Sequence, residues 1–163
     1  MPSVPQLFII DGQQRLTTIS LLLATLGKAI EESGSRLKTN RRKIESYFLF
    51  NNEKEEDARY KLLLTQSDKE TFIRLIEDRE LPAEASGRIV ENYQYFESQI
   101  RKRDIDLNSL YRGISKLIIV DIALDRDRDN PQLIFESLNS TGLDLSQADL
   151  IRNYSNPTSI MRI

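Results

Sequence analysis

The sequence predicts a mostly helical α+β domain, and three observations support this class. Apolar residues recur at helical spacing over four stretches, at about 13–33, 67–77, 89–100 and 107–115. Short apolar or aromatic runs of strand length lie at 6–10, 47–50, 60–64 and 117–124. The 163 residues, 39% hydrophobic and 29% charged, have the composition of one ordinary globular domain.

The N-terminal part predicts a strand, a turn and a long helix. Residues 6–10 are apolar and end at Asp11-Gly12, as expected for a buried strand that closes in a turn. A helix is predicted from Gln13 to about Ser33, before Gly34. Its apolar positions are Leu16, Ile19, Leu22, Leu23, Leu26 and Ile30.

The middle of the chain predicts two short strands and three helices. The strands are expected at 47–50 and 60–64, with a charged turn at 51–57 between them. A helix over 67–77 is followed by a linker at 82–87, and a further helix is predicted over 107–115. The helix before this last one is indicated by Ile89, Tyr93, Phe96 and Ile100 at steps of four, three and four.

The C-terminal part predicts one more strand and two helices. Residues 117–124 are rich in β-branched side chains and form the clearest strand of the sequence. A short helix at 131–138, a turn at 139–142 and a helix at 146–154 follow. We therefore expect a single domain over 1–154, and a disordered or truncated tail over 155–163.

The composition excludes several classes of chemistry. The chain has no Cys, which excludes disulfides and thiolate catalysis, and no His, which excludes Ser–His triads and imidazole-based metal sites. No apolar run is long enough to span a membrane, and no secretory signal is seen, so a cytoplasmic location is expected. The net charge of −2 argues against a broad nucleic-acid-binding surface.

One basic cluster has two interpretations. It precedes an acidic stretch and has no interleaved aromatic residues before Tyr47, so a solvated loop is favoured over a surface that contacts nucleic-acid phosphates. The cluster consists of Arg36, Lys38, Arg41, Arg42 and Lys43.

The turn at residues 11–15 has the composition of a phosphate-binding site. A helix that begins at Gly12 or Gln13 directs its first free N–H groups, and the positive end of its dipole, towards an anion. Arg15 could hold a phosphate bidentately, and Asp11 could hold a Mg²⁺ ion or orient a water molecule. Further donors are available from Gln13, Gln14, Thr17 and Thr18.

A structural interpretation of the same turn stays open. Asp11-x-x-Gln14 also matches a helix capping box, in which the carboxylate of Asp11 fills the anion position. Arg15 would then only form a salt bridge.

Two motifs resemble a known family. The string Ile10-Asp11-Gly12-Gln13-Gln14-Arg15-Leu16-Thr17-Thr18 is similar to the signature of the N-terminal domain of GmrSD-type modification-dependent restriction enzymes, within the ParB/sulfiredoxin-like group. A second segment, Phe135-Glu136-Ser137-Leu138-Asn139-Ser140-Thr141-Gly142 followed by Asp149-Leu150-Ile151-Arg152-Asn153, is similar to the family's second motif. Together the two motifs bracket nearly the whole chain.

The resemblance implies an NTP-binding and hydrolysing domain, with Mg²⁺ as the metal, in a bacterial system that restricts foreign DNA. It places residues 11–15 at the nucleotide site, with Asn139 and Gly142 in a nearby loop. The His-dependent nuclease half of the family is absent, and only seven residues precede Phe8, so the chain is expected to be the central part of a longer domain. The alternative is a non-catalytic module that binds DNA or another protein, in which the turn only caps a helix.

Overall fold

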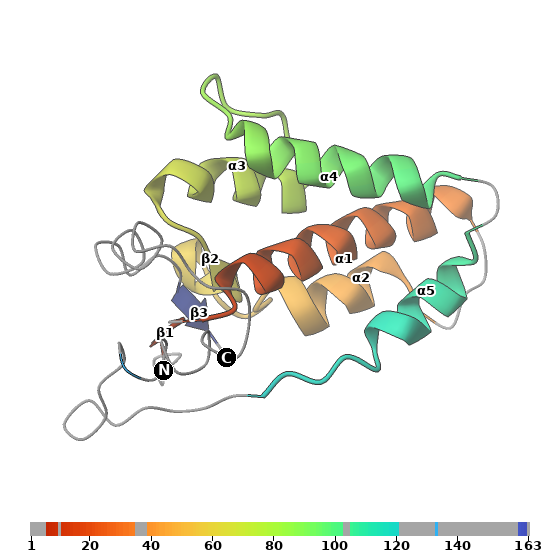
Figure 1. Ribbon diagram of the computed structural model, residues 1–163, viewed down its shortest axis with the longest axis horizontal. Helices are drawn as coiled ribbons and strands as arrows, with labels where there is room; N and C mark the ends of the chain where they lie inside the picture. The colour runs from red at the N-terminus through yellow and green to blue at the C-terminus, as the bar shows by residue number, and fades with distance from the viewer. Residues whose placement is uncertain are drawn as a thin grey trace.

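A long helix, α1 (Gln13–Ser33), is the element around which the other helices pack. The computed structural model describes residues 6–9, 11–34, 39–102, 105–120, 133 and 160–162. The helices α3 (Gln66–Ile76) and α4 (Gly87–Ile100) lie on one side of α1, and α2 (Arg41–Ile44) and α5 (Leu107–Ile114) lie on the other (Figure 1). The mostly helical α+β class is therefore confirmed.

Helix α1 forms where the apolar spacing predicts it. Its buried face includes Leu21 and Leu26, both fully buried, which contact the core shared by the neighbouring helices. The helix ends because Gly34 adopts a left-handed conformation with φ 61°, and its N–H donates to the carbonyl of Glu31. Glycine adopts this conformation without the steric cost of a Cβ, so a C-terminal cap at this position follows from the sequence.

The helices α3, α4 and α5 also match their predicted ranges to within one or two residues. The connection between α3 and α4 is fixed by Thr71, which is buried on α3 and accepts a hydrogen bond of 2.9 Å from the N–H of Ser86, the residue before α4. At the start of α5, the carboxylate of Asp106 accepts bonds from the N–H groups of Asn108 and Ser109. Such caps satisfy N–H groups that have no partner inside the helix.

A small antiparallel sheet joins three distant parts of the chain. Its strand order is β1 (Gln6–Phe8), β3 (Ile160–Arg162) and β2 (Leu62–Leu63), and β3 is paired on both edges. Gln6 lies opposite Arg162, and Ile160 lies between Phe8 and Leu63. Residues 160–162, which lie within the tail expected to be disordered or truncated, form this central strand, and pairing with distant partners gives such a strand no local periodicity in the sequence.

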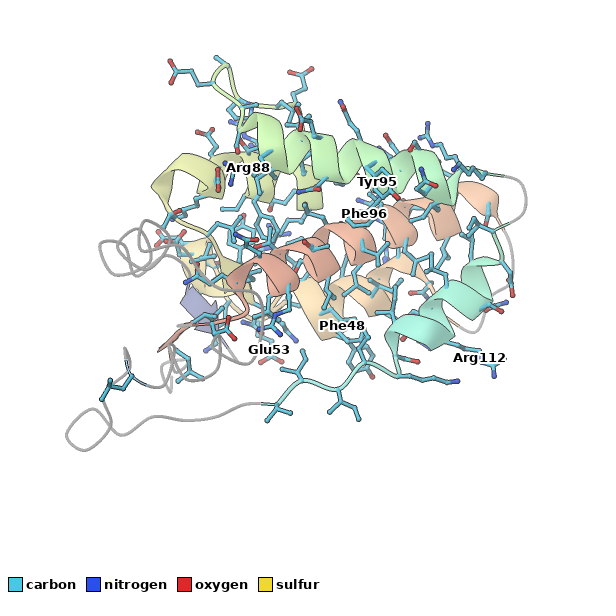
Figure 2. The ribbon with its side chains drawn as sticks, in the orientation of Figure 1. Phe48, Glu53, Arg88, Tyr95, Phe96 and Arg112 are labelled. Atoms are coloured by element: carbon cyan, nitrogen blue, oxygen red, sulfur yellow. The ribbon has the colours of Figure 1, made fainter. Side chains whose placement is uncertain are left out.

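The strand predicted at 47–50 is wrong. Residues Glu45–Leu49 instead form η1, a π-helical segment that continues α2, and only Phe50 makes an isolated bridge, to Tyr60. Leu49 and Phe50 are buried, whereas Tyr47 and Phe48 are exposed. Figure 2 labels Phe48. A short 3₁₀ helix, η2 (Glu56–Arg59), begins within the predicted charged turn and extends beyond it, and the predicted strand at 60–64 is reduced to β2.

The strand predicted at 117–124 is not seen over 117–120. These four residues have no regular structure, and Ile118 is 89% exposed. A strand needs a partner for its backbone N–H and C=O groups, and the described part of the chain provides none there. The rest of this predicted strand, residues 121–124, lies outside the described residues. So do the elements predicted at 131–138, 139–142 and 146–154, apart from Leu133.

No helix in the described ranges combines the length and the apolar character that crossing a membrane requires. Of the strand predicted at 6–10, the structure shows Gln6–Phe8, and the Leu7 side chain is 39% exposed rather than buried.

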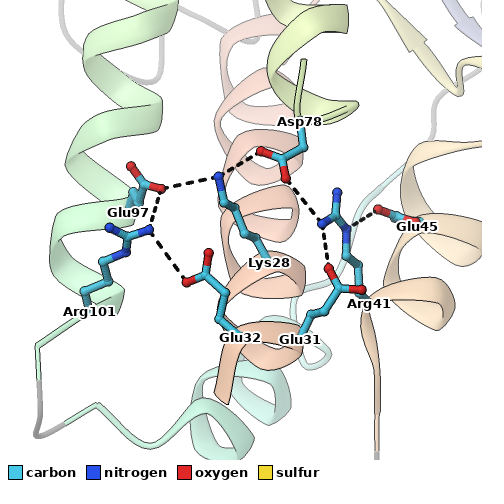
Figure 3. Close-up of polar contacts among 8 residues, drawn as sticks. All are labelled: Lys28, Glu31, Glu32, Arg41, Glu45, Asp78, Glu97 and Arg101. Carbon is cyan, nitrogen blue, oxygen red and sulfur yellow. Dashed lines mark hydrogen bonds and ion pairs between the residues drawn. The ribbon is translucent and has the colours of Figure 1, made fainter. Parts of the chain in front are cut away.

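An ion-pair network connects α1 with α2, α4 and the end of α3 (Figure 3). Lys28 Nζ on α1 lies 2.8 Å from Asp78 Oδ1 and 3.7 Å from Glu97 Oε1 on α4. Arg41 on α2 lies 2.7 Å from both Glu31 and Glu45 and 3.5 Å from Asp78 Oδ2. Arg41 is thus a half-buried helical residue with acidic partners, not part of the solvated loop that the basic cluster predicts.

Asp78 provides a test of this network. Its φ of 56° is left-handed, a conformation that Asp and Asn tolerate better than other side chains. The hydrogen bond from Lys28 lowers the pKa of Asp78 below its ordinary value of 3.8, and the same bond raises the pKa of Lys28. A carboxyl with a lowered pKa stabilises the folded state above its unfolded pKa, and this stabilisation is lost as the pH falls through the folded pKa.

We expect Asp78→Asn to lower the free energy of unfolding by about 1 kcal/mol or less at pH 7, because the ion pair is partly exposed. The difference from the wild type should shrink when both proteins are compared at a pH below 3. Urea denaturation at the two pH values measures it. Asparagine keeps the tolerance for positive φ, so an equal loss at both pH values would contradict the electrostatic explanation.

Candidate functional site

The turn between β1 and α1 is built around Gly12. This residue is the N-cap of α1 and has φ 86° and ψ 5°, a left-handed conformation. A Cβ at this position would lie 3.6 Å from Arg15 Nη2, which is an ordinary contact. The positive φ, rather than crowding, is therefore what favours glycine here.

Asp11 binds two donors of the same turn. Its Oδ1 accepts a bond of 2.7 Å from the N–H of Gly12, and its Oδ2 accepts one of 2.7 Å from Arg15 Nη2. The side chain of Arg15 is 74% exposed and that of Asp11 is 37% exposed. A pair this exposed contributes only about 0–1 kcal/mol to stability, so it can exchange for another partner at low cost.

The capping-box interpretation is wrong in its main feature. The N-cap is Gly12, one residue after Asp11, and no side chain caps the helix there. The carboxylate of Asp11 does not accept from the N–H groups of Gln13 or Gln14. The salt bridge that this interpretation assigned to Arg15 is nevertheless present.

Two predicted site residues are engaged in local hydrogen bonds. The side-chain amide of Gln13 donates to the carbonyl of Ile9 at 2.7 Å and so ties the start of α1 to the end of β1. The hydroxyl of Thr17 donates to the carbonyl of Gln13 at 2.9 Å. Gln13 therefore helps to position the turn, the bond of Thr17 stays within the first turn of α1, and the side chain of Gln14 is exposed.

The start of α1 presents open hydrogen-bond donors. The first helical bond joins the N–H of Leu16 to the carbonyl of Gly12 at 2.9 Å. Within the described residues, the N–H groups of Gln13, Gln14 and Arg15 have no acceptor, and the first turn of the helix carries no acidic residue. Free N–H groups, the helix dipole and an exposed guanidinium together favour an anion at this position.

The remaining predicted site features are only partly placed. Asn139 and Gly142 lie outside the described residues. Among the described residues, no group of three or more side chains is arranged to hold a metal ion. The single carboxylate of Asp11 fits a Mg²⁺ ion whose other ligands are phosphate oxygens and water, which is how Mg²⁺ is usually held at phosphate sites.

Comparison with protein-family models identifies the chain's relatives. The model described as "GmrSD restriction endonuclease, N-terminal domain" matches residues 2–155. The chain belongs to this family. No curated protein and no solved structure matches it.

Membership in the GmrSD N-terminal family gives the chain a role in a restriction system. The match contains strands β1 and β2, the Gly12 turn and the five described α-helices, and it contains the second motif at residues 135–153 as well. The family match therefore confirms the resemblance that the two motifs indicated.

The role of Ile9 in the turn between β1 and α1 was not predicted from the sequence. The carbonyl of Ile9 fixes Gln13, and through it the direction in which α1 leaves the sheet. The one local feature in the sequence that indicates this bond is the glutamine directly after Asp11-Gly12. A glutamine at this position is equally compatible with a hydrogen bond to a ligand.

Proposed function

We propose that the β1–α1 turn binds the phosphates of a nucleotide, and that the domain uses Mg²⁺ to hydrolyse an NTP in the cytoplasm as part of DNA restriction. The main support is the start of α1, where three N–H groups without an acceptor in the described structure adjoin the exposed Arg15. The proposal includes a ParB/sulfiredoxin-like strand–turn–helix core and a nuclease partner, outside this chain, that acts on the DNA.

Asp11 occupies two further donors that a bound phosphate could use. Its two oxygens accept from the N–H of Gly12 and from Arg15, the same groups that would contact phosphate oxygens. A bound phosphate would take these donors, and Asp11 would turn towards the metal. Mg²⁺ would neutralise phosphate charge and activate the terminal phosphate for attack by water.

The residues of the turn then have separate roles. Arg15 and the N–H groups after Gly12 stabilise the charge that develops on the phosphate oxygens. Gln13 keeps the turn in position through its bond to Ile9. Asp11 would hold the metal and, without a metal, would compete with the phosphate for Arg15.

Calorimetric titration with ATP and GTP, each with and without Mg²⁺, tests the proposal. We expect the wild-type chain to bind more tightly with Mg²⁺. Asp11→Asn should bind the metal-free nucleotide more tightly than the wild type, because it removes the competing negative charge, and it should gain little from added Mg²⁺.

A chain that binds neither nucleotide under any of these conditions would contradict the proposal and support the non-catalytic alternative. Thermal melts of both proteins provide the control for folding. An Asp11→Asn variant that keeps the full Mg²⁺ effect would remove Asp11 from the metal site.

A further inference from the structure

The π-helical segment η1 places two aromatic side chains in solvent. Its widened turn is marked by a bond of 2.8 Å from the N–H of Phe50 to the carbonyl of Glu45. In an α-helix, the positions three and four residues after the buried Ile44 would share its face, and these are Tyr47 and Phe48. The extra residue moves the next buried position to Leu49 instead.

Both aromatic side chains are exposed to solvent, and hydrogen bonds from Lys61 fix the backbone of η1. Tyr47 is 68% exposed and Phe48 is 41% exposed, with ring centroids 6.3 Å apart. Lys61 donates to η1 twice, from its Nζ to the carbonyl of Tyr47 at 2.8 Å and from its N–H to that of Leu49 at 3.0 Å. Single π-helical turns are uncommon and occur frequently at functional sites.

Two cations without carboxylate partners adjoin the aromatic residues. Arg42 and Lys43 are exposed on the preceding turn, and within the described ranges neither side chain forms an ion pair. The acidic residue of this helix, Glu45, is bound by Arg41 at 2.7 Å. The surface formed by Arg42, Lys43, Tyr47 and Phe48, the aromatic–cation face, therefore carries positive charge beside two π faces.

We propose that the aromatic–cation face binds single-stranded nucleic acid. Exposed aromatic rings stack with unpaired bases of any sequence, and adjacent cations neutralise the phosphates between them. Charge complementarity favours a polyanion over an apolar peptide. The exposed carboxylates of Glu53, Glu55 and Glu56 follow in the next loop and limit the face to a short stretch of nucleotides. This function lies beyond the proposed nucleotide site, which is formed by β1 and α1.

Fluorescence anisotropy with a short labelled single-stranded DNA of mixed sequence, measured over a salt series, tests the proposal on the full chain. Tyr47→Ala with Phe48→Ala should weaken binding by about tenfold or more without changing the salt dependence. Arg42→Ala with Lys43→Ala should reduce the slope of log K against log salt by about 1.4, because each phosphate that a cation neutralises on a single strand contributes roughly 0.7.

Matched controls lie on another helix. Tyr95 on α4 is 59% exposed, and in Figure 2 it lies on the opposite side of α1 from Phe48. Tyr95→Ala and Arg88→Ala should leave binding unchanged, and Tyr47→Phe should retain it because the ring remains. The proposal would be overturned if the wild type did not bind, or if Tyr95→Ala weakened binding as much as Tyr47→Ala with Phe48→Ala. It would also be overturned if the matched duplex bound more tightly than the single strand and the aromatic substitutions did not change that binding.

Discussion

Phe72→Ala is expected to lower the free energy of unfolding by about 3–5 kcal/mol. Phe72 is 1% exposed on α3, the helix that contacts both α1 and α4. Removing its ring takes away apolar burial and leaves a cavity that the surrounding helices can only partly fill. Urea denaturation followed by circular dichroism measures the loss.

Phe48→Ala is the matched control for Phe72→Ala. Phe48 is 41% exposed, so the same substitution there should cost much less. Domains are typically stable by about 5–15 kcal/mol, so Phe72→Ala could approach the limit of folding. Phe72→Leu, expected to lose roughly 1–2 kcal/mol, keeps the measurement possible. Equal losses at the two phenylalanines would contradict the description of the core.

Arg15→Ala is expected to weaken nucleotide binding by about tenfold to a hundredfold, because a hydrogen bond to a charged group is worth roughly 1.5–3 kcal/mol. Stability should hardly change, since the pair of Arg15 with Asp11 is exposed. Calorimetric titration with Mg²⁺ and nucleotide gives the affinity, and a thermal melt of the same sample gives the stability.

Two further substitutions define what Arg15 does. Arg15→Lys keeps the positive charge but not the planar fork of donors, and it should give an intermediate affinity. Arg88→Ala removes an exposed cation from α4 and should have no effect. If Arg15→Ala binds nucleotide as tightly as the wild type, the guanidinium does not contact the phosphates.

The parts of the fold that local spacing determines could be predicted from the sequence. The bounds of α1 follow from its apolar stripe and from Gly34, and the turn at Gly12 follows from the strand-to-helix pattern around it. The helix at Arg41 also had a local signal, because the side chain of Asn40 caps it by accepting from the N–H of Lys43 at 2.9 Å. The aromatic run at 47–50 hid this signal, since such residues favour strands.

The parts that depend on distant partners could not be predicted. Arg41 has a local partner in Glu45, but its pairs with Glu31 and Asp78 join α2 to other helices and depend on the fold. The β-branched residues at 117–120 have high strand propensity, but propensity supplies no neighbouring strand. At the candidate site, the sequence allowed for a salt bridge between Asp11 and Arg15, which lie four residues apart, but it did not predict the hydrogen bond from Gln13 to the carbonyl of Ile9.

The central position of β3 has a consequence for folding kinetics. Among the described residues, strand β1, which leads into the Gly12 turn, pairs with residues 160–162 alone, so its register forms after almost the entire chain has been brought together. The contacts between α1 and its neighbouring helices span shorter loops and should form earlier. The helical body should therefore assemble first, and the strand that leads into the Gly12 turn should be ordered in a late, slow step.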